Sequence, residues 1–210
     1  DGEYCFDEVL VDELRKKLHS VTSNNTFIVL HMIGSHGPTY YRRYPENKRV
    51  FSPDCQRSDI QNCTQDELVN TYNNTIAYTD LVLSEVINEL ETLSNESNTK
   101  TSMIYISDHG ESLGESGVYL HGLPYAFAPQ EQIKVPLIYW GDKIHHEAKL
   151  ACLNSIKEQP ISHDNIFDIL LGEMAINSKA YQPINNPFKQ CSIDIALAKT
   201  APETMVQGVK

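Results

Sequence analysis

The sequence predicts an α/β protein in which helices flank a largely parallel β-sheet. Two segments, 7–19 and 65–93, repeat apolar residues every three or four positions, as amphipathic helices do. Three short apolar runs, at 27–33, 102–107 and 135–140, have the length and composition of strands. Helical and strand-like segments alternate along the chain with long connections, which is the pattern of a layered α/β fold with parallel strands.

The limits of the helices can be read from capping residues. Thr64 and Glu67 have the spacing of a capping box, in which each side chain bonds the backbone N–H of the other residue. A last helix is predicted over 162–171, with Ser162 as its cap and Gly172 as its end. We expect a helix of about eight turns after the capping box and a shorter one near the C-terminus.

The run from Phe27 to Ile33 is continuously apolar apart from one histidine, as in a strand whose two faces are both covered by helices. The third run is entered through Pro136, which suits the start of a strand or an edge strand. No linker divides residues 1–198 into two domains, and 199–210 are expected to form a disordered tail.

Composition and charge exclude several classes of protein. The chain has 210 residues, 40% of them hydrophobic, and a formal net charge of −11. It is long enough to bury a core, and it lacks the basic stripes with which proteins bind nucleic acid. Its longest apolar run, 27–33, is much shorter than the roughly 20 residues that span a bilayer. A segment that anchors or exports the protein is therefore expected outside the chain.

The five cysteines are odd in number. Cys55 and Cys63 flank a short polar, turn-prone stretch, which suggests a disulfide loop and hence an oxidising compartment such as the periplasm or the cell exterior. These two residues could instead be metal thiolates, although no CxxC spacing accompanies them. Of the remaining residues, at least one is free or has its partner elsewhere; they are Cys5, Cys152 and Cys191.

Residues able to bind a metal follow the second predicted strand. Asp108, His109 and Glu111 come directly after the run 102–107, and ligands of open α/β sheets bind at the carboxyl ends of strands. A carboxylate oxygen beside an imidazole nitrogen suits a zinc-like ion, so Asp108 and His109 are candidate metal ligands. The alternative is a polar turn that caps a helix.

Two further histidines lie in comparable positions. His36 follows the first predicted strand, in a Gly-Ser-His-Gly-Pro stretch, and His121 lies in a long glycine-rich loop. Each histidine alone is more often structural than functional. We expect His36, His121 and Glu111 to converge with Asp108 and His109 in one metal and phosphate pocket.

The chain resembles the phosphoethanolamine transferases, which include the lipid A enzymes and the mobile colistin-resistance enzymes. The resemblance extends from Cys5 to about Cys191, and the block DHGESLGE…YLHG is its most specific part. Other matching segments are IGSHGPTYYRRYP, CQRSDIQNCT, LVNTYNNTIAYTD and VPLIYW. It implies an alkaline-phosphatase-like or sulfatase-like fold, of which the chain is the C-terminal part.

The resemblance also implies an activity. Phosphoethanolamine would move from phosphatidylethanolamine to lipid A through a threonine intermediate, at the periplasmic face of the bacterial inner membrane. Zinc would be held by a glutamate, that threonine, and the residues matching Asp108 and His109. His36, Glu111 and His121 match the substrate side of the pocket, where they could contact a second zinc, the ethanolamine ammonium or the leaving group.

The family's glutamate ligand, nucleophilic threonine and membrane domain lie upstream of the segment that begins at Asp1. Thr26, Thr39 and Thr75 are not in the nucleophile's context. We therefore expect the isolated chain to bind zinc weakly and to lack transferase activity. Cys5 matches a cysteine whose disulfide partner lies upstream in relatives.

Two other functions fit parts of the sequence. A metal-dependent phosphatase or sulfatase would share the aspartate–histidine pair but transfer to water. A non-enzymatic extracellular binding module would account for the disulfide loop and the acidic surface, but not for the histidines after the strands. The basic residues could meet lipid phosphates or form a solvated loop; they are Arg42, Arg43, Lys48 and Arg49.

Overall fold

The computed structural model describes residues 5–20 and 25–192. Contacts divide the chain into two compact units, 1–142 and 143–210. The predicted disordered tail, 199–210, lies outside the described residues. Within the described ranges, no helix is both long enough and apolar enough to cross a membrane.

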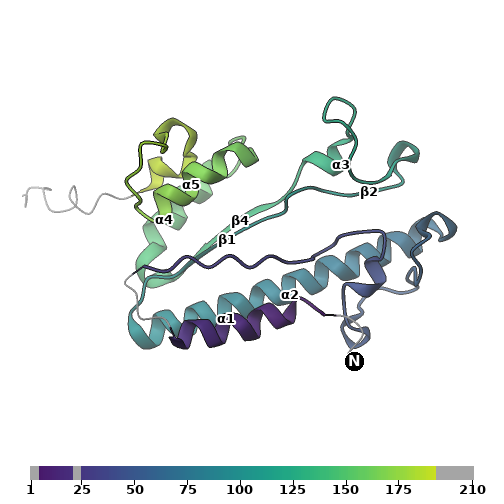
Figure 1. Cartoon of the computed structure of the whole chain (residues 1–210), viewed down its shortest axis with the longest axis horizontal. Coiled ribbons are helices and arrows are strands. Elements are labelled where there is room, and N and C mark those ends of the chain that lie inside the picture. The colour runs from purple at the N-terminus through teal and green to yellow at the C-terminus, as the bar shows by residue number, and fades with distance from the viewer. Residues whose placement is uncertain (1–4, 21–24, 193–210) are drawn as a thin grey trace, which may run out of the picture. The chain divides into compact units, whose positions relative to one another are not determined.

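Two helices form one side of the first unit. Helix α1 (Glu8–Ser20) packs along α2 (Gln65–Ser97), as Figure 1 shows. Their apolar faces meet in a buried cluster that contains Val11 and Leu14 from α1 and Val82 from α2. Both bonds of the predicted capping box at the start of α2 are present. The helical periodicity therefore predicted both helices to within a few residues.

The sheet of the first unit is antiparallel. Strand β1 (Ser102–Ile106) pairs with β4 (Leu137–Gly141), with Ser102 opposite Gly141. The prediction of a mostly parallel sheet is thus wrong for the strands that the structure describes. Parallel strands need a long crossover, usually a helix. Here the connection holds only the four-residue helix α3 (Gln130–Ile133) and a small hairpin of β2 (Ser112–Leu113) and β3 (Tyr119–Leu120).

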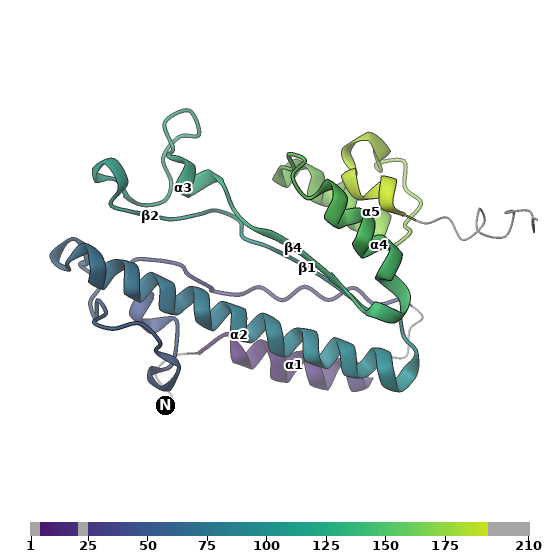
Figure 2. The same ribbon diagram turned by 180° about the vertical axis from the view of Figure 1, so that it is seen from behind.

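Residues 27–33 are extended, but no hydrogen-bonded strand is assigned to them. Figures 1 and 2 both show this segment running lengthwise between α2 and the β1–β4 pair. Successive side chains of an extended chain point in opposite directions, so Ile28 and Leu30 pack on the core while Phe27 and Val29 are exposed. The prediction of a strand buried on both faces is therefore wrong, since only one face packs on the described residues.

The second unit holds α4 (Lys143–Ile156) and α5 (Ile166–Glu173). Ser162 caps a 3₁₀ turn that leads into α5, so the predicted cap is correct. Gly172 lies inside α5 instead of ending it, and helix α4 was not predicted. A disulfide joins Cys152 of α4 to Cys191 in a C-terminal 3₁₀ turn.

Candidate metal centre

Three loops bring histidine side chains together. His36 follows the extended segment 27–33, His109 follows β1, and His121 follows β3. The ring centroids of His109 and His121 are 3.9 Å apart, and His36 lies 5.1 Å from His121 and 6.0 Å from His109. One nitrogen from each ring lies within 4.8 Å of the others. Three of the five predicted site residues therefore share one centre.

The Nδ1 atom of each histidine ring already lies within hydrogen-bond distance of an oxygen atom. The Nδ1 atoms of His36 and His109 lie 2.8 and 2.9 Å from the carbonyl oxygen of the glycine that follows each. His121 Nδ1 lies 2.7 Å from Glu111 Oε1. Carbonyl and carboxylate oxygens accept hydrogen bonds, so each Nδ1 carries the hydrogen and each neutral ring keeps its lone pair on Nε2. The cluster thus presents three nitrogen donors of the kind that metals bind.

Glu111 connects this cluster to the protein interior. Its Oε1 accepts from His121, and its Oε2 accepts a 2.8 Å hydrogen bond from the Tyr40 hydroxyl. Only 3% of the Glu111 side chain is exposed. Burial, and then the charge of Glu111, raises the pKa of Tyr40, so the phenol stays protonated and donates. Glu111 is therefore held on both oxygens and acts on the cluster through His121.

Asp108 lies at the solvent edge of the cluster. Its side chain is 87% exposed, and its Oδ1 lies 3.9 Å from His109 Nε2. The same oxygen accepts a hydrogen bond from the backbone N–H of His109. Asp108 is thus on the side of His109 that carries the free lone pair, although it stands outside the group of three nitrogens.

Residues that the sequence did not point to hold the loop of His36. Both carboxylate oxygens of Asp7 accept backbone hydrogen bonds, from Ile33 at 3.0 Å and Gly34 at 2.8 Å. On the other side, the hydroxyls of Thr75 and Ser35 lie 2.7 Å apart and share a hydrogen bond. Asp7 is 26 residues from Ile33, and no local pattern marks such a contact.

Gly110 allows the loop after β1 to pack closely on α3. Its N–H donates to the carbonyl oxygen of Gln132 at 2.9 Å. A Cβ at this position would lie 2.0 Å from the carbonyl oxygen of Glu131, which is backbone and cannot rotate away. Because Gly110 stands between His109 and Glu111, this contact fixes two site residues at once.

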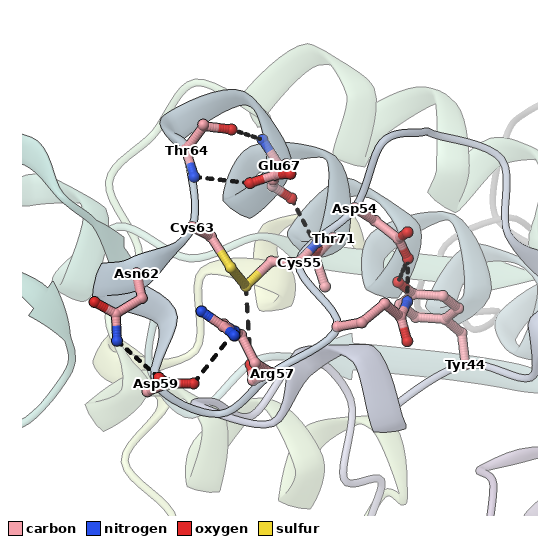
Figure 3. Close-up of a disulfide and its surroundings, with 11 residues drawn as sticks. Tyr44, Asp54, Cys55, Arg57, Asp59, Asn62, Cys63, Thr64, Glu67 and Thr71 are labelled. Carbon is pink, nitrogen blue, oxygen red and sulfur yellow. Dashed lines mark hydrogen bonds and ion pairs between the residues drawn. A yellow bond between two sulfur atoms is a disulfide. The ribbon is translucent and has the colours of Figure 1, made fainter.

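The predicted disulfide between Cys55 and Cys63 is confirmed (Figure 3), which excludes the thiolate alternative for this pair. Cys55 belongs to a buried apolar cluster that also contains Tyr40 and Leu113. The loop therefore packs against the residue that holds Glu111. Cys5 is free and exposed.

Two of the basic residues are engaged within the protein. Arg43 donates to the carbonyl oxygen of His36 at 2.9 Å and to the Thr39 hydroxyl. Arg49 pairs with Glu46 at 3.0 Å and with Asp54 at 3.5 Å. These contacts favour a structural role for Arg43 and Arg49 over binding of lipid phosphates.

Comparison with known proteins gives a consistent result. The sulfatase family model matches residues 1–176. Phosphoethanolamine transferase EptA of Escherichia coli K12 is 43% identical over 195 residues, which are 91% of this chain and 35% of that protein. Phosphatidylethanolamine transferase Mcr-1 of E. coli is 47% identical over 126 residues, 59% of this chain and 23% of that protein. The chain thus spans about a third or less of these relatives.

Two solved structures share the fold. The C-terminal periplasmic domain of phosphoethanolamine transferase EptC from Campylobacter jejuni has a TM-score of 0.80 and 42% identity, and covers 87% of this chain and 58% of that one. The soluble domain of lipooligosaccharide phosphoethanolamine transferase A from Neisseria meningitidis has a TM-score of 0.83 and 39% identity, over 91% and 57%. The predicted sulfatase-like α/β fold is confirmed, and the chain belongs to the sulfatase family.

Proposed function

We propose that this chain is part of a zinc-dependent transferase that moves phosphoethanolamine from phosphatidylethanolamine to lipid A at the periplasmic face of the inner membrane. The observation that carries the proposal is the convergence of one nitrogen from each of three histidines in a sulfatase-family chain that is 43% identical to a phosphoethanolamine transferase. Three converging histidines suit a site of phosphoryl transfer. A binding module would not need such a group of nitrogen donors.

The side chains that meet here suit zinc. Imidazole nitrogen is a preferred zinc donor, and catalytic zinc sites keep three protein ligands and one open position. His36, His109 and His121 offer three neutral rings, and the Asp108 carboxylate stands beside His109. Zinc bound here would offset negative charge on phosphoryl oxygens and lower the pKa of an attacking hydroxyl.

The protein residues would position this chemistry. Glu111 accepts the Nδ1 hydrogen of His121 and so keeps its Nε2 directed away from the carboxylate. His109 and His36 are held in the same way by glycine carbonyl oxygens. Asp108 is the most exposed of these residues, and a rotation of its side chain would bring the carboxylate to a bound ion. These residues bind and orient the reacting group.

The nucleophile would come from outside this chain. Within the described residues, Thr39 accepts a bond from Arg43, and the Thr75 hydroxyl donates to the carbonyl oxygen of Tyr72 and lies 2.7 Å from the Ser35 hydroxyl. These bonds occupy both hydroxyls in structural roles. They support the expectation that the covalent intermediate forms on a threonine of the longer protein.

The test is mass spectrometry of lipid A from cells that express the complete protein. We expect phosphoethanolamine on lipid A with the wild-type protein and with His19→Ala, which changes a histidine at the end of α1, outside the cluster. His109→Ala should abolish the modification. Release of phosphoethanolamine into water, with lipid A unmodified, would support the hydrolase instead.

The 210-residue chain alone provides a second test. Incubated with zinc, lipid A and labelled phosphatidylethanolamine, it should transfer no label and form no labelled adduct. Label trapped on a residue of this chain would place the nucleophile inside it and overturn that part of the proposal.

A further inference from the structure

We infer that Tyr40 is a positioning residue of the metal centre, whose hydroxyl holds the Glu111 carboxylate in the orientation that directs the free nitrogen of His121 toward the cluster. The inference rests on the proposed function, because it assigns a residue to the same site. It concerns a residue that does not itself reach the three nitrogens.

The first support is the chain of contacts. Tyr40 lies in the 3₁₀ turn Tyr40–Arg42 and is 1% exposed. Its hydroxyl donates to Glu111 Oε2 at 2.8 Å, and Glu111 Oε1 meets His121 Nδ1 at 2.7 Å. Metal-binding histidines commonly bond a carboxylate through the other nitrogen, and such outer partners influence metal affinity. Tyr40 extends this arrangement by one buried residue.

The second support is that the phenol ring is fixed. The Tyr40 and Tyr72 rings are nearly perpendicular, with centroids 5.7 Å apart. The backbone at Gly37 crosses so closely that a Cβ there would lie 2.5 Å from the Tyr40 hydroxyl oxygen. A ring clamped in this way presents its O–H in one place. Gly37 also directly follows His36, so this close contact holds the loop of His36 against Tyr40.

The third support is that Glu111 would lose a hydrogen-bond donor if the Tyr40 hydroxyl were removed. In the described part of the chain, the Tyr40 hydroxyl is the side-chain donor placed on Oε2, and Glu111 is buried. A buried carboxylate oxygen without a donor is costly, so the carboxylate would turn or draw in water. Either change disturbs the oxygen that orients His121.

The structure supplies a matched control. Tyr44 is 3% exposed and donates a hydrogen bond of the same length, 2.8 Å, to Asp54 Oδ2. Figure 3 shows this pair beside the disulfide loop. Asp54 also pairs with Arg49, so the carboxylate that Tyr44 binds contacts an arginine, whereas the carboxylate that Tyr40 binds contacts a histidine. Tyr44→Phe therefore removes a similar buried hydrogen bond away from the metal centre.

The experiment is a titration of the 210-residue chain with Co²⁺, followed by the visible absorption of the bound ion. We expect Tyr40→Phe to weaken Co²⁺ binding by about tenfold or more, the range typical of lost outer partners. Tyr44→Phe should bind as the wild type does. In a Glu111→Gln background, Tyr40→Phe should add no further loss, because it acts through that carboxylate.

An unchanged affinity in Tyr40→Phe, or an undiminished effect in the Glu111→Gln background, would overturn the inference. A second readout needs no metal: ¹⁵N NMR of the ring nitrogens reports which nitrogen of His121 carries the hydrogen. We expect Nδ1 in the wild type and in Tyr44→Phe, and a tautomer mixture in Tyr40→Phe. If the wild-type chain bound no Co²⁺, the expectation that it binds metal weakly would be wrong, while this NMR comparison would still decide the role of Tyr40.

Discussion

The disulfide loop and the histidine cluster contain similar polar residues, but their hydrogen bonding differs. Around the Cys55–Cys63 loop, the polar groups satisfy one another: Thr64 and Glu67 cap each other's backbone, and Asn62 donates to Asp59 (Figure 3). In the cluster, every Nδ1 is bonded, so each ring has its lone pair on Nε2. A closed network stabilises a fold, whereas an incomplete one with converging donors is available to a ligand.

The two regions share one apolar cluster, which contains Cys55, Tyr40 and Leu113. The disulfide loop nevertheless supplies none of the described hydrogen-bond partners of the histidines or of Glu111, so damage to it should lower the stability of the fold without changing the metal affinity of the molecules that remain folded. Damage to the loops that carry the histidines should change metal affinity directly. Mutations can separate these two kinds of effect.

Gly110→Ala should have the largest effect and should affect both properties. The new Cβ would meet the carbonyl oxygen of Glu131 at 2.0 Å, so the backbone between His109 and Glu111 must move. We expect a loss of about 3 kcal/mol in the free energy of unfolding, together with loss of Co²⁺ binding. Urea denaturation and the Co²⁺ titration measure the two quantities.

The control is Gly117→Ala, since no atom lies within 4 Å of a Cβ at that position. Its positive φ of +77° should still cost about 1 kcal/mol. Its Co²⁺ affinity should match the wild type. Equal losses of stability and of affinity in the two variants would contradict the importance of the Gly110 contact.

The Cys55→Ser/Cys63→Ser double variant should affect stability alone. Opening a short disulfide loop costs about 2–3 kcal/mol in the chain-entropy treatment. We expect that loss in urea denaturation, with an unchanged Co²⁺ affinity measured well below the unfolding transition. Cys5→Ser should change neither, because Cys5 is free and exposed. A large fall in metal affinity would show that the two regions are not separable.

Patterns local in the sequence predicted much of this molecule. The periodic segments 7–19 and 65–93 became α1 and α2, and the capping box and the short disulfide were correctly identified. Helix α4, Lys143–Ile156, was missed because its polar and apolar residues alternate with little periodicity. Strand direction was also missed, since an apolar run has the same composition in parallel and antiparallel pairs.

Sequence patterns likewise predicted some residues of the site and missed others. His36 and His109 follow predicted strands, so their convergence could be expected from the rule that ligands gather at strand ends, and His121 was expected to join them from a long glycine-rich loop. Tyr40 and Asp7 could not be found in this way. Tyr40 lies 71 residues from Glu111, and the bond between them depends on how the loops pack. The roles of Asp108, Glu111 and the histidines in metal binding and catalysis stay predictions.

Thr64→Ala should have the smallest effect. Thr64 accepts a bond from the Glu67 N–H, and Glu67 bonds the Thr64 N–H in return. Removing the hydroxyl should cost about 1 kcal/mol of stability and leave Co²⁺ affinity unchanged. Thr64→Ser keeps a capping oxygen and should behave nearly as the wild type in thermal unfolding. Equal unfolding temperatures for the Ala variant and the wild type would show that the cap is not limiting.

We propose that His36, His109 and His121 form one metal centre through their Nε2 atoms. The direct measurement is anomalous diffraction at the zinc absorption edge from crystals of the chain grown with zinc. We expect a peak about 2.0–2.1 Å from the Nε2 atoms of these histidines, lost in His109→Ala. A zinc ion bound elsewhere, for example at His163 or at the exposed Cys5 thiol, with the cluster empty, would contradict it.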